Sequence, residues 1–92
     1  MSLLQKAKAR QRALNISGEL FLSNRPDKKL MLIHDNKRIH FGLKGSQTYL
    51  EGASIEKRKA YRARHMAIMT KNGTPAYEVE YSSSWLSYHI LW

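Results

Sequence analysis

The chain has 92 residues, the length of one small domain. Sixteen Lys and Arg against seven Asp and Glu give a formal net charge of +9, which favours polyanionic partners such as nucleic acid. The absence of cysteine excludes disulfides and thiolate metal sites. No apolar run approaches the roughly 18–20 residues of a membrane-spanning helix, so we expect no membrane partner.

The charge is unevenly distributed along the chain. Residues 1–71 carry all sixteen basic residues and five acidic ones, whereas residues 72–92 carry only Glu78 and Glu80 as charged groups. The sequence therefore predicts a basic body with a mildly acidic, aromatic end.

The N-terminal segment is basic and helical in pattern. Residues 3–14 are rich in Leu and Ala, which are good helix formers. Their like-charged neighbours are four residues apart with no carboxylate between them, and each such pair costs about 0.2–0.5 kcal/mol in an isolated helix. We therefore predict that residues 1–15 form a basic helix or arm that orders fully against a partner, before a single α+β domain over residues 16–92. An organelle transit peptide is the less common alternative.

The next segments predict strands. Residues 16–22 alternate loosely and end in a turn that contains Pro26. Two short apolar runs then flank Asp35-Asn36-Lys37, which predicts a β-hairpin although the turn lacks an Asn-Gly pair. A loop with several glycines follows, in which Tyr49-Leu50 is the expected anchor.

A main helix is predicted from about residue 55 to residue 70. Ser54 suits the N-cap position and Glu56 the first turn, and Asn72-Gly73 is a stop signal. The fold class that these elements predict is α+β, with a small antiparallel sheet and one dominant helix.

The last segments predict a strand and a short helix. Residues 76–81 alternate as a strand would, which places Tyr77, Val79 and Tyr81 on one side. Ser82-Ser83-Ser84 then suits the start of a short aromatic helix. We expect its aromatic side chains to fold back onto the sheet, to form a subunit contact, or both; they are Trp85, Tyr88 and Trp92.

The main helix has a predicted core stripe and two basic ridges. At 100° per residue, Tyr61, His65, Ile68 and Met69 lie on one side and are expected to hold the helix to the sheet. The cations divide into one ridge at seven-residue steps and one on the other flank. The first ridge is Lys57, Arg64 and Lys71, and the second is Arg58, Lys59 and Arg62.

Two interpretations of these cations compete: an ordinary solvated helix face, or a surface that holds an anion. Lys57, Arg58 and Lys59 stand near the positive end of the helix dipole, where each cation is unfavourable by about 0.3–1 kcal/mol. A bound anion would reverse this cost, and helix N-termini bind phosphate readily. We therefore expect charge reversal at Arg58 and Arg62 to abolish DNA retention while leaving the melting temperature nearly unchanged.

The sequence shows no catalytic or metal-binding motif. Its four histidines are not paired at three- or four-residue spacing, and no cysteine or acidic cluster accompanies them. Glu51, Glu56 and His65 could be drawn as a metal-dependent nuclease, but no pattern indicates that they converge. We predict no enzyme, no metal and no cofactor.

Three short motifs resemble a known family. They are Phe41-Gly42, the pattern K-R-x-x-Y-x-x-R-H that contains Tyr61 and Arg64-His65, and a terminal Leu91-Trp92. Together they resemble small, basic, uncharacterised proteins of nucleocytoplasmic large DNA viruses, with the Marseillevirus-like group nearest. The likeness covers roughly residues 38–92.

The chain departs from this family pattern at three positions. Ser54 stands where an acidic residue is common, and both residue types are good N-caps. Tyr88 replaces a basic residue and Met69 an aromatic one. The resemblance implies a viral setting, such as packaging in the particle, and no particular mechanism.

These observations favour a non-enzymatic, virion-associated protein that binds nucleic acid non-specifically, DNA rather than RNA, through phosphate contacts. The alternative is a structural homo-oligomer or scaffold that contacts acidic proteins. We expect it in the virion, and in the host nucleus or cytoplasm during infection. The expected phosphate-binding residues are Lys57, Arg58, Lys59, Arg62, Arg64, Lys71, Lys6, Lys8, Arg10 and Arg12.

Overall fold

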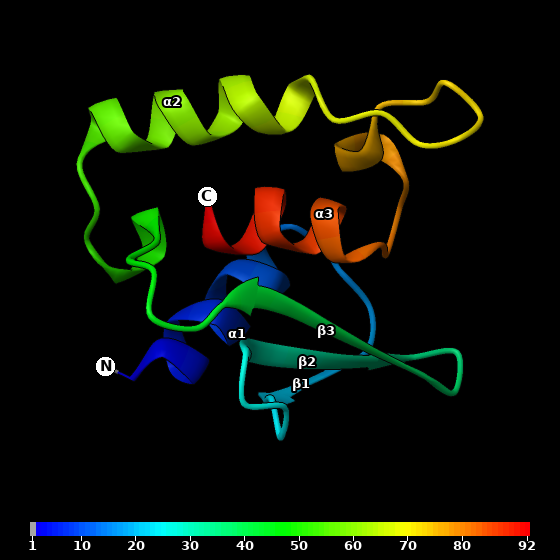
Figure 1. The fold of residues 1–92 in the computed structure, drawn as a ribbon. Coiled ribbons are helices and arrows are strands. Elements are labelled where there is room, and N and C mark those ends of the chain that lie inside the picture. The colour runs from blue at the N-terminus through cyan, green and yellow to red at the C-terminus, as the bar shows by residue number, and fades with distance from the viewer. Residues whose placement is uncertain (1) are drawn as a thin grey trace.

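The computed structural model describes residues 2–92 (Figure 1) and has the α+β architecture that the sequence predicts. Two longer helices and three strands account for most of the regular structure, with shorter helical segments between and after them. In chain order the elements are α1 (Leu3–Ala13), β1 (Glu19–Leu22), β2 (Lys28–His34), β3 (Lys37–Leu43), the 3₁₀ turn η1 (Tyr49–Glu51), α2 (Ile55–Met66), the 3₁₀ turn η2 (Ala76–Glu78), α3 (Ser83–Leu86) and the π-helical turn η3 (Ser87–Leu91). We call α3 and η3 together the C-terminal helix. No helix within residues 2–92 is both long and apolar enough to cross a membrane.

The sheet is antiparallel, with the strand order β1-β2-β3. The predicted hairpin is confirmed as β2 and β3, in which Leu30 pairs with Phe41. Its turn places Asp35 at φ 50° and Asn36 at φ 61°. These two left-handed residues match the geometry that short hairpins prefer, so Asp-Asn serves where Asn-Gly is commoner.

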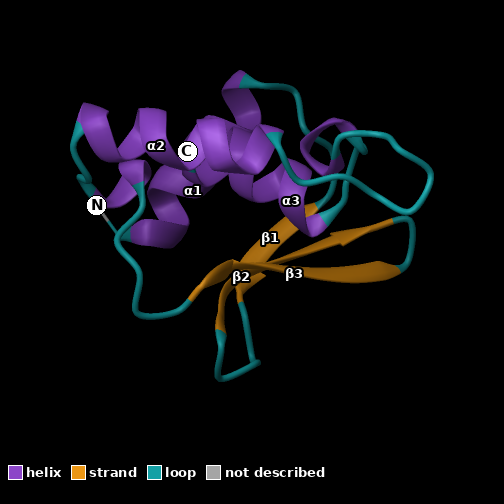
Figure 2. Cartoon of the chain, turned by 45° about the horizontal axis from the view of Figure 1, so that its top comes forward, coloured by secondary structure: helices purple, strands orange, loops and turns teal. Residues whose placement is uncertain are grey.

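The core lies between one face of the sheet and the C-terminal helix. Leu30, Leu32 and Phe41 of the sheet are fully buried, as are Leu86 and Ile90 of the C-terminal helix. Figure 2 shows that the helices gather on one side of the sheet. In Figure 1 the C-terminal helix lies between the sheet and α2, which makes α2 an outer layer.

Helix α1 is joined to the same core. Ser2 caps it through a reciprocal capping box with Gln5. Ala7 is fully buried, and the Gln11 side-chain amide donates to the carbonyls of Ile16 and Gly18 at 3.0 and 2.9 Å. The predicted basic N-terminal helix is therefore present, and it packs against β1, η1 and the C-terminal helix.

Helix α2 begins where the sequence predicts and ends early. Ser54 caps it, and the helix stops at Met66 rather than near residue 70. The chain instead turns back, because the Ala76 N–H donates to the Ile68 carbonyl at 2.8 Å and Met69 forms a bridge with Pro75. A close return of the chain to residues 68–70 cannot coexist with a continued helix there.

The predicted core stripe of α2 is wrong at two of its positions. The surface that it was expected to pack against, the sheet, is also wrong. The side chains of Ile68 and Met69 are 48% and 59% exposed. Helix α2 buries no residue fully, and Tyr61 stacks on Trp92 of the C-terminal end rather than on the sheet. The helix faces the sheet across an intervening layer, which periodicity alone does not reveal.

The strand predicted over residues 76–81 is also wrong, since Ala76–Glu78 form a 3₁₀ turn. The alternating tyrosines pack on separate aromatic groups instead. Tyr77 contacts the Tyr88 ring, and Tyr81 stacks on His34 with ring centroids 3.8 Å apart. Tyr81 reaches this position with φ 62°, outside the strand region.

The predicted C-terminal helix is confirmed, with the Ser82 side chain accepting from the Trp85 N–H. The C-terminal helix also folds back onto the sheet, where it contacts β3, and Leu91 is buried. Trp92 is only 6% exposed, but its ring stacks on Tyr61 of α2 and not on the sheet.

Candidate nucleic-acid interface

A groove of about 590 Å³ separates α2 from β3, the loop that follows it and the C-terminal helix. We call this hollow the groove throughout. Its apolar lining comes mainly from Phe41 and Leu43 of β3, Ala60 of α2 and Trp92. Its polar lining is Lys28, Ser46, Gln47, Thr48, Lys57, Tyr61, Arg64, His65, Ser83, Ser84 and Ser87.

The groove is cationic. Lys57 and Arg64 reach it from α2, and Lys28 reaches it from the start of β2. No acidic side chain is among the described residues that line it. An anion in the groove would therefore meet positive charge from two separate elements without a competing carboxylate.

Stacked aromatic rings hold α2 above the groove. The rings of Tyr61 and Trp92 lie parallel, with centroids 4.2 Å apart and planes 10° apart. His65 stacks on Tyr61 at 4.5 Å. Burial raises the pKa of the Tyr61 hydroxyl. Burial, with the nearby Arg64, lowers the pKa of His65.

Two residues of the second ridge of α2, Arg58 and Arg62, lie outside the groove lining and contact the end of the C-terminal helix. Arg58 Nε donates to the main-chain oxygen of Trp92 at 2.8 Å, and an Arg62 Nη donates to the same oxygen at 3.0 Å. Arg10 Nε of α1 donates to the His89 carbonyl at 2.7 Å. We call these three residues the arginine clamp.

The arginine clamp is attracted to the negative end of the C-terminal helix, but its three positive charges repel one another. The last carbonyls of a helix carry partial negative charge, which guanidinium groups stabilise. Burial lowers the pKa of Arg10, and the charges of Arg58 and Arg62 lower it further. Arg62 Nε is buried without a hydrogen-bond partner. The ring faces of Tyr49 and Tyr88 cover Arg58 and Arg62 at 4.3 and 4.7 Å.

The structure thus separates cations that look equivalent in the sequence. Lys57 and Arg64 line the groove, while Arg58 and Arg62 are engaged internally. Lys59 is exposed on α2, outside the groove lining, and Lys71 is exposed in the turn beyond α2.

The cations of α1 do not join the groove. Lys8 and Arg12 are exposed and line a smaller hollow of about 360 Å³ beside β1. That hollow also contains Glu19. Lys6 is partly buried, and Arg10 belongs to the clamp.

Sequence reasoning missed Lys28 and the serines of the groove. Lys28 shares its face of the sheet with Leu30 and Leu32, since residues two apart along a strand point the same way. A lysine at two-residue spacing from buried leucines of the same strand is a sequence signal that could have identified Lys28. Ser84 and Ser87 carried no such signal, because they enter the groove only through the fold-back of the C-terminal helix.

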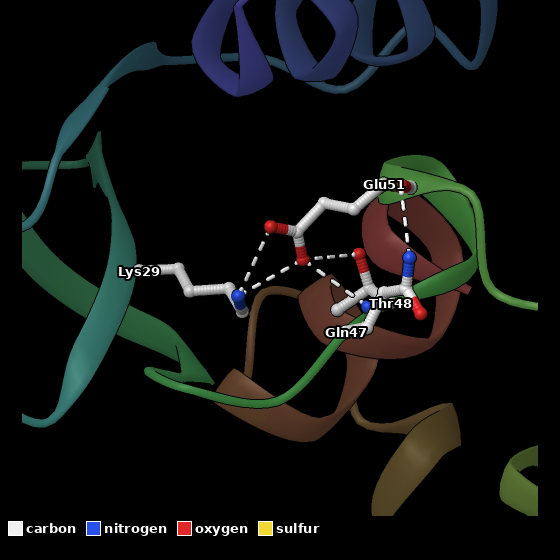
Figure 3. A network of polar contacts seen from close by, with 4 residues as sticks. All are labelled: Lys29, Gln47, Thr48 and Glu51. Atoms are coloured by element: carbon white, nitrogen blue, oxygen red, sulfur yellow. Dashed lines mark hydrogen bonds and ion pairs between the residues drawn. The ribbon is translucent and has the colours of Figure 1, made fainter.

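A polar network fixes the loop at one end of the groove (Figure 3). Lys29 Nζ lies 2.9 Å from Glu51 Oε1, and the Thr48 hydroxyl donates to the same carboxylate at 2.8 Å. The Gln47 amide donates to the Glu51 carbonyl at 3.4 Å. Burial acts to raise the pKa of Glu51, but the hydrogen bonds from Lys29 and Thr48 outweigh it and hold the pKa below its usual range.

This network also bears on the nuclease alternative. The Glu51 carboxylate is engaged by Lys29 and Thr48, and Glu56 is exposed in the first turn of α2. Across residues 2–92, no three His, Asp or Glu side chains are grouped closely enough to hold a metal ion.

The three motifs of the family resemblance meet at one place. Gly42 has φ 83°, and a Cβ built on it would lie 2.7 Å from Leu91 Cδ1. Next along the chain, Trp92 stacks on Tyr61 and accepts the hydrogen bond from Arg58. The motif residues therefore form one interlocked structural unit that places α2, and with it the cations of the groove.

Comparison with known proteins identifies relatives of unknown function. The model of a family described as "Family of unknown function (DUF5754)" matches residues 18–65, just over half of the chain. The chain is also 37% identical over 75 residues to "Uncharacterized protein L851" of Acanthamoeba polyphaga mimivirus, which covers 76% of this chain and 75% of the relative. No solved structure matches. The chain therefore belongs to DUF5754, an uncharacterised protein family of large DNA viruses.

Proposed function

We propose that this protein binds nucleic acid without sequence specificity, DNA rather than RNA, through phosphate contacts in the groove. The observation that carries the proposal is the meeting of Lys28, Lys57 and Arg64 around one groove whose described lining contains no acidic side chain. We further propose that it is a non-enzymatic virion-associated protein, present in the host nucleus or cytoplasm during infection, from the Marseillevirus-like part of its family.

The position of Lys57 supports a phosphate ligand. It lies in the first turn of α2, where the helix dipole disfavours a cation. A phosphate in the groove would neutralise Lys57 and also interact favourably with the dipole. Arg64, two turns further along, could bind a second phosphate about 10 Å away along the helix axis.

The experiment compares charge reversals on two sides of the same helix. Lys57→Glu and Arg64→Glu, made as separate variants, each change the charge of the groove by two units, and Lys59→Glu makes the same change at a nearby exposed cation outside it. We expect each groove variant to lose DNA retention in a gel-shift assay and Lys59→Glu to retain most of it. Equal losses in all variants would mean that net charge alone attracts DNA, and would overturn the groove as the site.

A salt series tests the phosphate contacts themselves. If each of the three groove cations neutralises one phosphate, affinity falls roughly 20- to 40-fold between 50 and 200 mM salt, with the smaller fall for a single strand. Binding that stays constant across this range, or absence of binding to any nucleic acid, would contradict the proposal.

A structural homo-oligomer or scaffold that contacts acidic proteins is the second candidate. The aromatic residues expected to join subunits are largely engaged within the chain, since Trp92 is buried and Tyr88 covers Arg62. Apolar side chains at and beyond the end of α2 favour this candidate instead, because Met66, Ile68 and Met69 are each about half exposed. Light scattering over a concentration series would show a defined oligomer that is indifferent to added DNA.

A further inference from the structure

We infer that the groove takes a single unpaired strand of nucleic acid and does not admit a duplex. This inference rests on the proposed function and names the form of nucleic acid that the groove fits. Three properties of the groove carry it: where its cations lie, how large it is, and what lies between the cations.

The cations stand on two sides of the groove. Lys57 and Arg64 belong to α2, the outer layer, whereas Lys28 belongs to β2 of the sheet, and the C-terminal helix lies between α2 and the sheet. A ligand must enter between these elements to meet all three charges. A duplex is a rigid rod with phosphates along its outside, so it would reach the α2 rim without reaching Lys28.

The volume of the groove suits a few nucleotides. At about 590 Å³ it lies within the range of pockets that enclose small organic ligands, about 300–1,000 Å³. One or two nucleotides of a flexible strand fit such a space, while a base-paired segment does not.

The lining between the cations is apolar. Leu43 of β3 and Ala60 of α2 present exposed apolar surface below a basic rim, and Phe41 and Trp92 lie buried beneath them. An unpaired base has an apolar ring to bury beside its charged phosphate, whereas a duplex keeps its bases stacked inside. Single-strand sites commonly pair a positive groove with surface that receives bases.

The same lining predicts little discrimination between bases. The facing sides of the Tyr61 and Trp92 rings are stacked on each other, and His65 stacks on Tyr61 as well. These rings are held in the fold rather than free to sandwich a base. The groove thus offers apolar contact that any base can make.

The experiment fills the groove without changing charge. Ala60 and Ala63 are both exposed on α2, but only Ala60 lines the groove. Ala60→Phe places a phenyl ring in the groove, and Ala63→Phe is the matched control with the same loss of helix propensity. The probes are an oligothymidylate of about 12 nucleotides, long enough for one typical site, and a mixed-sequence duplex of equal length.

We expect the wild-type protein to bind oligothymidylate about tenfold more tightly than duplex, the ratio that covering one exposed leucine side chain such as Leu43 with a base would supply. This preference would run against simple electrostatics, because the duplex has about twice the charge per unit length. Ala60→Phe should weaken oligothymidylate binding about tenfold and leave duplex binding unchanged. Ala63→Phe should change neither.

Lys28→Gln supplies a second test should Ala60→Phe lower the melting temperature. It removes the charge on the sheet side, so oligothymidylate binding should weaken while duplex binding on the α2 rim does not. Equal affinity for the two probes, or equal effects of the two Phe variants, would overturn the inference. Either result would leave the proposed function intact, provided that the Lys57 and Arg64 variants still lose more DNA retention than Lys59→Glu does.

Two other results would also overturn it. Polyglutamate that competes as well as oligothymidylate would identify the occupant as an acidic protein segment. Failure to bind either nucleic acid would end both this inference and the proposed function.

Discussion

At the scale of single residues, the cations of α2 differ in what they contact, and therefore in whether they stabilise the fold or are available to a ligand. Arg58 and Arg62 donate to one main-chain oxygen of Trp92. Lys57 and Arg64, on the other edge of α2, line a groove that contains no acidic side chain among its described residues. The first pair stabilises the fold, and the second pair is available to a ligand.

The arginine clamp predicts a loss of stability on truncation. Arg58→Met or Arg62→Met removes a hydrogen bond from a charged donor, worth about 1.5–3 kcal/mol. Relief of repulsion within the clamp offsets part of this, so we expect each change to cost about 1–2 kcal/mol, or roughly 5–10 °C in melting temperature. Thermal unfolding measures it.

Lys59→Met is the matched control, because Lys59 is exposed on the same helix. We expect its stability to stay within about 0.5 kcal/mol of wild type. If all three variants have the same melting temperature, the arginine clamp contributes nothing to the stability of the fold. The hydrogen bonds argue against the sequence-based expectation that charge reversal at Arg58 and Arg62 leaves the melting temperature nearly unchanged.

The sequence could not separate these cations for a physical reason. Helical periodicity placed Lys57 with Arg64 and Arg58 with Arg62 on different flanks, which agrees with the structure. The partner of Arg58 and Arg62 is the main-chain oxygen of Trp92, some thirty residues away. No side-chain pattern marks a main-chain partner at such a distance along the sequence.

At the scale of elements, the C-terminal helix packs closely on β3 at Gly42, because a glycine has no Cβ to hold the two elements apart. Gly42 combines φ 83° with a position where a Cβ would lie 2.7 Å from Leu91 Cδ1. Any other residue there would both strain the backbone and displace Leu91. This contact fixes the depth of the C-terminal helix on the sheet, and thereby the position of Trp92 under α2.

Gly42→Ala should therefore destabilise the protein by more than backbone strain alone. Gly45 is the control, since it has φ 93° and no atom within 4 Å of a built Cβ. Both changes carry the left-handed penalty, about 1–2 kcal/mol. Gly42→Ala should cost about 1–3 kcal/mol more, because it overpacks the contact with Leu91. Urea unfolding of the two variants measures the difference.

A double variant checks the cause of that difference. Leu91→Ala removes the atom that a new Cβ would meet, so Gly42→Ala should cost less in that background, by about 0.5–3 kcal/mol. Strictly additive costs would show that Leu91 is not the obstacle.

Elements were predictable where local chemistry decides them. The caps Ser54 and Ser82 and the hairpin about Asp35-Asn36 depend on neighbours within four residues. The failures depend on partners further along the chain. Met69, beyond the end of α2, bridges Pro75 six residues later. Tyr81 stacks on His34, which is 47 residues before it, and does not extend as a strand.

At the scale of the whole molecule, the net charge is +9, and few of the basic side chains lie beside an acidic one. Within residues 2–92, acidic side chains lie within 4 Å of only three basic ones, namely Arg25, Lys29 and His34. A chain of this size also has a small core, since small domains bury a modest share of their surface. Further positive charge should therefore destabilise it.

Histidines are the first source of such charge as the pH falls. Burial lowers the pKa of both His65 and His89. Arg64 adds to the effect at His65. Arg62 and Arg10 add to it at His89. A backbone hydrogen bond from His65 to Ser84 favours the protonated form, but burial and Arg64 outweigh it. The other close neighbours of the two imidazoles within residues 2–92 are the aromatic rings of Tyr61, Tyr88 and Trp85.

The sign of the pH effect follows from these shifts. Because the folded protein disfavours protonation of His65 and His89, the unfolded chain binds more protons once the pH falls below about 6.5, the ordinary imidazole value. Stability should thus be greatest near neutral pH and decline as the pH falls toward the lowered values in the folded state. The pKa of Glu51 is depressed, so its contribution persists to lower pH and is lost only as the pH falls through its folded-state value.

We therefore expect two separable declines in melting temperature on acidification. The double variant His65→Phe with His89→Phe keeps aromatic rings in place and should flatten the decline between about pH 7 and pH 5.5, where ordinary histidines titrate. Glu51→Gln should leave that decline intact and remove the one at lower pH, at the cost of lower stability near neutral pH. Calorimetry across the pH range measures both, and an unchanged profile in the double histidine variant would show that the two imidazoles are not held neutral by the fold.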